Sequence, residues 1–309
     1  MNRREDWYCV IYHLFVAALY FLFFVAYSMY FETFGAAEKV CFVATSVVML
    51  GWISGLNVGV VYHNHVHKPV FRNANLNCWF GRFWTISGGW PAALWNYAHL
   101  DVHHRHVLET NDWTLPRELD GKFESIYSYC FFHPFRYARA FLNAFRSDDE
   151  RFWRREPIKE CFIFLVIWLV PWLVDPQMAL LLWLLPQWFG NAVVMGAGMY
   201  VQHLNCRPKT EQHPHRHSNE FHSWFFNMTM FNIGFHLVHH DWPGVHWYDL
   251  AEHHNKMQDR MVADDYRVVP FGYYRAAFRQ ELVAGAHQPV ESHQFENKGT
   301  PFEKPFELN

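Results

Sequence analysis

The sequence predicts an all-α integral membrane protein, with four transmembrane helices in two hairpins and a histidine-rich helical cap on the cytoplasmic side. Two observations predict this class. Apolar residues make up 51% of the 309 residues and aromatic residues 19%, which is more than soluble domains usually contain. These residues gather in long runs without charge, and the runs are separated by stretches rich in histidine and charged residues.

Four apolar runs are candidates for membrane spans, since about 20 apolar residues cross roughly 30 Å of hydrocarbon. The runs 8–31, 40–62 and 178–201 contain no Asp, Glu, Lys or Arg. Run 158–174 is shorter and begins with Lys159 and Glu160, so it spans only if both side chains reach back to the interface. Buried helices of a soluble protein are the alternative, but runs of this length rarely lack charge there.

The charges beside these runs predict their orientation. The turns 32–39 and 175–177 lie on one side of the membrane and contain only one of the 26 Lys and Arg residues, Lys39. Positive charge beside spans favours the cytoplasm, so both termini and the remaining polar segments are predicted to be cytoplasmic. We expect one domain over 1–275, whose first span is retained and not cleaved as a signal peptide. Its cap comprises 63–157 and 202–275, and 276–309 is a polar tail.

Eight histidines fall into three tight clusters, and a ninth, His203, stands apart. Within each cluster the spacing of three or four residues places the imidazoles on one helix face, so that they point toward one place. Three such clusters among 22 histidines predict a metal centre in the cap, with scattered surface histidines as the alternative. The clusters are His63 with His67, His99 with His103 and His104, and His236 with His239 and His240.

The number and type of these side chains predict two metal ions. First-row metals take four to six ligands, so nine imidazoles are too many for one ion. The six cysteines form no CxxC pair, as a closed zinc site would usually require, whereas nitrogen ligation with open positions suits a redox iron pair. Nearby carboxylates are candidates to orient the rings, or are ordinary surface groups: Asp101, Asp112, Asp241 and Glu252.

Three other segments leave alternatives open. The aromatic segment 79–97, broken by two glycines, is expected to lie in the membrane interface or as a buried cap helix. The basic segment 136–159 suits an acidic electron donor or acyl carrier, although the preference for positive charge on the cytoplasmic side of spans explains the same charges and is favoured. The net charge of -3 indicates no nucleic-acid partner. Four further histidines belong to a solvated loop or a metal site: His213, His215, His217 and His222.

The clusters and their surroundings resemble the membrane fatty acid desaturase superfamily, which includes acyl desaturases, lipid hydroxylases and carotenoid ketolases. HNHVH is similar to its first histidine box, and HHRHVLETND (103–112) is similar to the second. VQH (201–203) is similar to the short motif before the third box. NIGFHLVHHDWPGVHWYDLAEHH (232–254) resembles the third box with its Asn lead, following Pro and terminal His. The resemblance covers about 51–271.

This resemblance implies a non-haem di-iron oxygenase whose active site lies in the cytoplasmic cap. Asn232 would contact the centre beside the ligands or through water. His65 and His106 lie inside the boxes but off the matching positions, and replacement of a ligand by either stays an alternative. Which histidine serves which iron is left open. Carried over by position, the iron ligands would be His63, His67, His99, His103, His104, His203, His236, His239 and His240.

The implied activity is O2-dependent desaturation of an unactivated C–C bond in a fatty acyl lipid. Such a C–H bond is not acidic, so side-chain acid-base chemistry alone cannot break it and a redox cofactor is needed. The chain contains no GxGxxG and no HPGG, so we expect a separate electron donor of the ferredoxin or cytochrome b5 type. The same scaffold would also serve a lipid hydroxylase, a carotenoid ketolase or a terminal-alkene-forming fatty acid decarboxylase.

A metal transporter is the hypothesis from a different class. Transporters coordinate ions at mid-membrane depth. The predicted spans offer little for this beyond Asn57, Asn191 and some Cys or Met, and all three clusters lie outside the spans. The sequence therefore favours the oxygenase.

Overall fold

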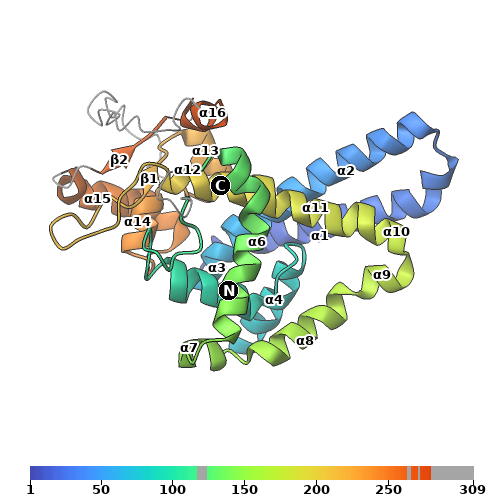
Figure 1. Cartoon of the computed structure of the whole chain (residues 1–309), viewed down its shortest axis with the longest axis horizontal. Helices are drawn as coiled ribbons and strands as arrows, with labels where there is room; N and C mark the ends of the chain where they lie inside the picture. The colour runs from blue at the N-terminus through green and yellow to red at the C-terminus, as the bar shows by residue number, and fades with distance from the viewer. Residues whose placement is uncertain (117–123, 263–265, 271, 280–309) are drawn as a thin grey trace. The chain divides into compact units, whose positions relative to one another are not determined.

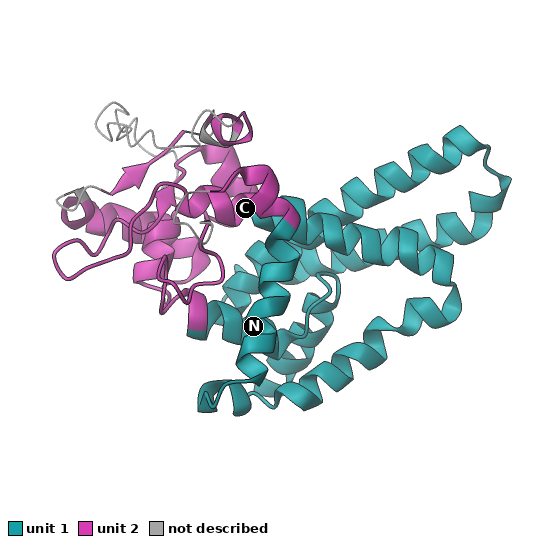
Figure 2. Ribbon diagram, in the orientation of Figure 1, with its two compact units in different colours: residues 1–101, 132–196 teal, residues 102–131, 197–309 magenta. Residues whose placement is uncertain are grey.

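The computed structural model describes residues 1–116, 124–262, 266–270 and 272–279. Helices dominate these residues, and the only strands among them are β1 (Asn219–Glu220) and β2 (Arg267–Val268), which pair in parallel. The predicted all-α class is therefore confirmed. The chain divides into two compact units, each built from separate stretches of sequence (Figure 2). The first unit comprises 1–101 and 132–196, and the second comprises 102–131 and the described part of 197–309.

The first unit consists of helices (Figure 1), and π-helical turns interrupt several of them. The turn η1 (Phe31–Thr33) joins its first two helices, which contact each other. The helices of the unit are α1 (Asp6–Tyr30), α2 (Ala36–Leu56), α3 (His63–His67), α4 (Ala74–Ile86), α5 (Ala92–Asn96), α7 (Glu150–Trp153), α8 (Pro157–Trp168), α9 (Val170–Val174), α10 (Pro176–Ala179) and α11 (Leu185–Phe189). The π-helical turns within it are η2 (Asn57–Tyr62), η4 (Leu180–Leu184) and η5 (Gly190–Met195).

Three helices run from one unit into the other, and the second unit adds short helices of its own. The shared helices are η3 (Tyr97–His103), α6 (Ile126–Phe145) and α12 (Gly196–His203). The helices of the second unit are α13 (Trp224–Thr229), α14 (His236–Asp241), η6 (Trp247–Asp249), α15 (Leu250–Val262) and α16 (Gly272–Phe278). Helix α16 continues past residue 276, where the polar tail was predicted to begin, and residues 280–309 lie outside the described part of the chain.

All four predicted spans are helices long and apolar enough to cross a membrane. They cover Asp6–Thr33, Ala36–His67, Pro157–Val174 and Pro176–His203. Large apolar side chains are exposed along them, with Phe21 at 66% and Leu173 at 84%, as expected for surfaces that face lipid. In the third span Glu160 is buried and forms an ion pair with Arg82 of α4 (Nη2 to Oε1, 2.5 Å), which offsets the cost of its charge.

The second and fourth spans approach each other closely at three glycines. Gly51 and Gly55 are four residues apart on α2, and Gly190 begins η5 on the facing span. A Cβ atom at Gly190 would lie 2.6 Å from the carbonyl oxygen of Gly51 and 3.1 Å from the backbone nitrogen of Gly55. Small residues four apart commonly allow such backbone contact between membrane helices. The packing of these two spans therefore depends on the missing side chains.

Alanine at Gly190 should destabilise the protein, because the added methyl group forces the two backbones apart. Overpacking of this kind costs about 1–3 kcal/mol. The thermal unfolding midpoint of detergent-purified protein measures the effect. Gly198 is a matched control on the same span, since a Cβ there meets no atom within 4 Å. Gly198→Ala should leave the midpoint unchanged or raise it slightly, and equal midpoints for the two variants would contradict the packing argument.

Three amide side chains on the spans bind the end of α4 and the turn that follows it. Asn57, Gln187 and Asn191 each donate to a backbone carbonyl within 84–88. Each amide oxygen also accepts a hydrogen bond from an indole N–H, those of Trp84, Trp168 and Trp90 respectively. Asn57 and Asn191, the amides that a transporter could use as ion ligands, thus bind backbone carbonyls of this region. The turn breaks the aromatic segment 79–97 into two helices, on the first of which Trp79 and Phe83 are each 48% exposed.

Candidate metal centre

Predicted ligands lie in or directly after π-helical turns. His63 follows η2, and His99 and His103 lie in η3. A π-helical turn inserts an extra residue into a helix, which changes the direction of the side chains around it, and such turns are frequent at functional sites. The local backbone therefore marks both histidine boxes of the first half of the chain.

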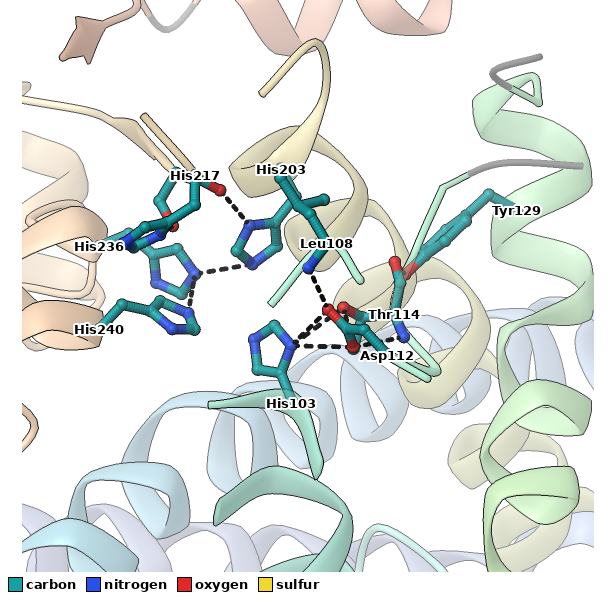
Figure 3. Close-up of polar contacts among 10 residues, drawn as sticks. His103, Leu108, Asp112, Thr114, Tyr129, His203, His217, His236 and His240 are labelled. Carbon is teal, nitrogen blue, oxygen red and sulfur yellow. Dashed lines mark hydrogen bonds and ion pairs between the residues drawn. The ribbon is translucent and has the colours of Figure 1, made fainter. Parts of the chain in front are cut away.

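Four of the nine predicted ligands form a buried cluster in the second unit. His103, His203, His236 and His240 each offer a ring nitrogen, and these nitrogens lie within 4.8 Å of one another. The Nε2 atom of His236 lies 3.2 Å from Nε2 of His203 and 3.1 Å from Nε2 of His240 (Figure 3). Two nitrogens bound to one ion at about 2.0–2.1 Å lie roughly 3.0–3.4 Å apart. The spacing and the donor set of this cluster fit one transition-metal ion.

Hydrogen bonds orient two of these rings for ligation. The Nδ1–H of His203 donates to the carbonyl of His217 (2.9 Å), and Nδ1–H of His103 donates to the carboxylate of Asp112 (3.2 Å), as Figure 3 shows. Both bonds place the lone pair of the neutral imidazole on Nε2. Burial lowers the pKa of His240 well below its ordinary value, and the neighbouring histidines lower it further. Neutral imidazoles are the form that binds metal.

Asp112 is the predicted carboxylate that the structure places beside a ligand. Besides His103 it accepts hydrogen bonds from the backbone N–H of Leu108 (2.9 Å) and from the backbone N–H (3.0 Å) and hydroxyl (2.8 Å) of Thr114. Burial raises the pKa of Asp112, but His103 and these N–H groups lower it more, so the pKa lies below its ordinary value. The charged carboxylate thus holds the His103 ring and closes its own loop.

The remaining predicted ligands form two smaller groups, one in each unit. In the second unit, Nε2 of His239 lies 3.2 Å from Nε2 of His104. In the first unit, Nε2 of His67 lies 2.9 Å from Nε2 of His99, and the rings of His63 and His99 are 4.2 Å apart. The Nδ1–H of His63 donates to the carbonyl of Gly59 (3.1 Å), which again directs Nε2 away from the backbone.

The two box histidines left out of the predicted ligands have other surroundings. His65 stacks on Tyr62, with ring centroids 5.7 Å apart, and accepts the backbone N–H of Val70. His106 is partly exposed and pairs with Glu109 (2.9 Å). Among the described residues neither belongs to a group of side chains that could hold a metal ion.

The other predicted neighbours of the centre have different roles. Asp101 forms an ion pair with Arg155, and Glu252 pairs with Lys256 on the exposed face of α15. Asp241 directly follows His240 and binds two histidines, His215 and His217. Asn232 has a positive φ of 59° and donates to the carbonyl of Trp247 (3.1 Å), so it shapes the turn that leads into α14.

Sequence reasoning missed one further group, which consists of Glu220, His222 and His254. Their ligand atoms lie within 4.8 Å of one another, and Glu220 and His254 are buried. His254 was considered only as the end of the third box, and His222 as part of a solvated loop or a metal site that was not linked to residue 254. The histidine-rich stretch directly before the third box was the one sequence signal for this group. Nothing in the spacing of its residues indicated that His222 lies beside residue 254.

The fold and the site together define a helical membrane protein that carries buried histidine clusters able to hold metal. The family model described as fatty acid desaturase matches residues 39–272. The chain therefore belongs to the fatty acid desaturase family, as the histidine boxes predicted. A comparison with curated proteins found no match.

Proposed function

We propose that the protein is a fatty acyl or lipid desaturase that uses O2 and two iron ions. The observation that carries the proposal is the buried four-histidine cluster, whose ring nitrogens have metal-ligand spacing in a chain of the desaturase family. We assign Asn232 to a supporting position beside the centre. The proposed iron ligands are His63, His67, His99, His103, His104, His203, His236, His239 and His240.

The residues around the four-histidine cluster prepare it for metal in two ways. The imidazoles of the four-histidine cluster are neutral when metal binds, and burial shields them from water. Asp112 and the carbonyl of His217 hold two rings in fixed tautomers. When bound, the iron pair supplies the O2-dependent chemistry that removes hydrogen from unactivated carbon, which no side chain achieves by proton transfer.

We place the active site and both termini in the cytoplasm, in a cap on two helical hairpins, because Lys39 is the only cation in the turns between paired spans. The exposed apolar side chains of the spans support a substrate that is dissolved in the membrane. We propose a separate electron donor of the ferredoxin or cytochrome b5 type. The basic segment 136–159 offers limited support for an acidic partner, because four of its cations already form ion pairs with carboxylates of this chain: Arg151, Arg154, Arg155 and Lys159.

The test compares the lipids and hydrocarbons of cells that produce the protein with those of cells carrying an empty vector, by gas chromatography with mass spectrometry. We expect a new double bond in an acyl chain, about two irons per purified chain, and O2 consumption coupled to lipid oxidation. A hydroxylated lipid, a ketone or a terminal alkene would instead identify one of the related reactions. Conversion of only small water-soluble compounds, or protein without transition metal, would end the proposal.

A further inference from the structure

We propose that Glu220 is a positioning residue for the metal-binding helix α14, acting through a clasp that it forms with His222 and His254. The inference rests on the proposed iron ligation. It concerns a carboxylate that belongs to none of the histidine boxes and that no spacing in the sequence connects to them. We use the term clasp for these three residues only.

The clasp joins two separate segments of the second unit, residues 220–222 and helix α15, around one oxygen atom. Glu220 ends β1 and is fully buried. Its Oε2 atom lies 2.8 Å from Nε2 of His222 and 2.9 Å from Nδ1 of His254, which lies on α15. The two imidazole rings meet edge to face, with centroids 4.6 Å apart. The position of Glu220 is thus determined from two sides.

The second carboxylate oxygen reaches the metal-binding helix. The Oε1 atom of Glu220 accepts the backbone N–H of Val238 (3.3 Å), which is the third residue of α14. The first N–H groups of a helix have no partner within the helix, and the residue that precedes α14, Phe235, has no side-chain acceptor. Glu220 therefore supplies from another segment the hydrogen bond that a capping side chain would normally provide.

This contact controls the direction of the ligands. Val238 lies between His236 and the pair His239 and His240, so a rotation of α14 about its axis would turn all three rings together. The backbone on the other side of Glu220 is also held, since its carbonyl accepts the N–H of Val269 (2.8 Å). The clasp thus links the two-stranded sheet to α14 and restrains rotation of that helix about its axis.

The charge of Glu220 explains why two imidazoles surround it. A carboxylate that is buried without partners strongly destabilises a protein. Burial raises the pKa of Glu220, but His254 and His222 outweigh this effect and lower it to about 2. The side chain is therefore a charged acceptor at neutral pH. Charged acceptors form stronger hydrogen bonds to backbone N–H groups than neutral ones do.

The experiment replaces Glu220 with glutamine in the full-length, detergent-purified protein. Glutamine keeps the shape but loses the charge, so we expect α14 to be held less firmly. Removing a residue that orients metal ligands typically weakens metal affinity or activity about 10- to 100-fold. We expect a loss of iron affinity in this range against a competing chelator, and a shifted ligand-field spectrum of the ferrous protein. Glu211→Gln, an equal charge change on an exposed loop, should match wild type in both readouts.

Four outcomes would overturn the clasp. The first is wild-type iron retention together with an unchanged spectrum in Glu220→Gln. The second is a lower thermal unfolding midpoint of the metal-free variant together with an unchanged spectrum of its ferrous form, which would show a purely structural role. The third is loss of a third metal equivalent from the variant, which would make the cluster a metal site of its own. If Glu220→Gln does not fold, His222→Gln is the second variant. The fourth outcome is a wild-type iron affinity in His222→Gln.

Failure of the proposed function would look different. In that case wild type itself would contain no iron or oxidise no lipid, whatever the variants do. His222 is partly exposed, so its replacement by glutamine, which keeps an N–H donor, should disturb the fold little. We expect His222→Gln to lower iron affinity in the same direction as Glu220→Gln but by a smaller factor.

Discussion

Replacing His240 with alanine should abolish the lipid product and lower bound iron, while the protein still inserts into membranes. His240 is 4% exposed, and its Nε2 lies 3.1 Å from Nε2 of His236. Without this ring the cluster has three nitrogens, fewer than the four to six ligands that first-row metals take. Elemental analysis of purified protein and gas chromatography of cell lipids measure the two effects. The spans lie elsewhere in the sequence, so insertion should not change.

His106→Ala is the matched control, because His106 belongs to a histidine box but pairs with Glu109 at the surface. It should retain both iron and product. His239→Ala tests the smaller group with His104 and should behave like His240→Ala. Normal iron content and turnover in His240→Ala would remove His240 from the proposed ligands, and a loss of iron in His106→Ala would reopen the assignment of the second box.

Alanine at Gly234 should destabilise the second unit by about 3 kcal/mol or more, at the upper end of overpacking costs. A Cβ at this position would overlap the carbonyl oxygen of Phe221 and the side-chain oxygen of Asn227. Both groups are fixed by hydrogen bonds, since Asn227 donates to the carbonyl of Phe221 (2.7 Å) and accepts the N–H of Gly234 (3.0 Å). Gly234 lies two residues before His236, so iron content should fall together with stability.

The control for this prediction lies ten residues further along the chain. A Cβ at Gly244 meets no atom within 4 Å, so Gly244→Ala should unfold at the wild-type temperature and retain its iron. Thermal unfolding with and without iron separates the effect on folding from the effect on binding. Equal stability of Gly234→Ala and Gly244→Ala would show that the backbone before α14 adjusts easily, and would weaken the argument that α14 has a fixed orientation.

The membrane spans could be predicted because their cause is local. Hydrocarbon thickness sets a length, and the backbone must satisfy its own hydrogen bonds within that length. The runs 8–31 and 40–62 therefore predicted helices that the structure extends by only a few residues at each end. The nine histidines could be proposed for a related reason, because helical spacing and the resemblance to a family both act within short stretches of sequence.

The side chains that surround each histidine were harder to predict from the sequence. Four carboxylates near the boxes were candidates to orient rings, and the structure shows Asp112 hydrogen-bonded to the predicted ligand His103 within its own loop. Asp241 instead holds His215 and His217, and the carbonyl of His217 holds His203. These hydrogen-bond partners depend on which loops fold over the cluster, so proximity in sequence does not predict them.

Local composition and periodicity were thus enough to predict the membrane class and the four candidate spans, and helical spacing together with the family resemblance gave the candidate ligands. Only the tertiary structure decided that His103, His203, His236 and His240 share one buried cluster. It alone also placed Glu220 between His222 and His254, where its other oxygen accepts the Val238 N–H of α14. The physical reason is that a buried carboxylate or imidazole must find its partners wherever the chain brings them. Residues 220 and 254 are far apart in sequence, and packing alone makes them neighbours.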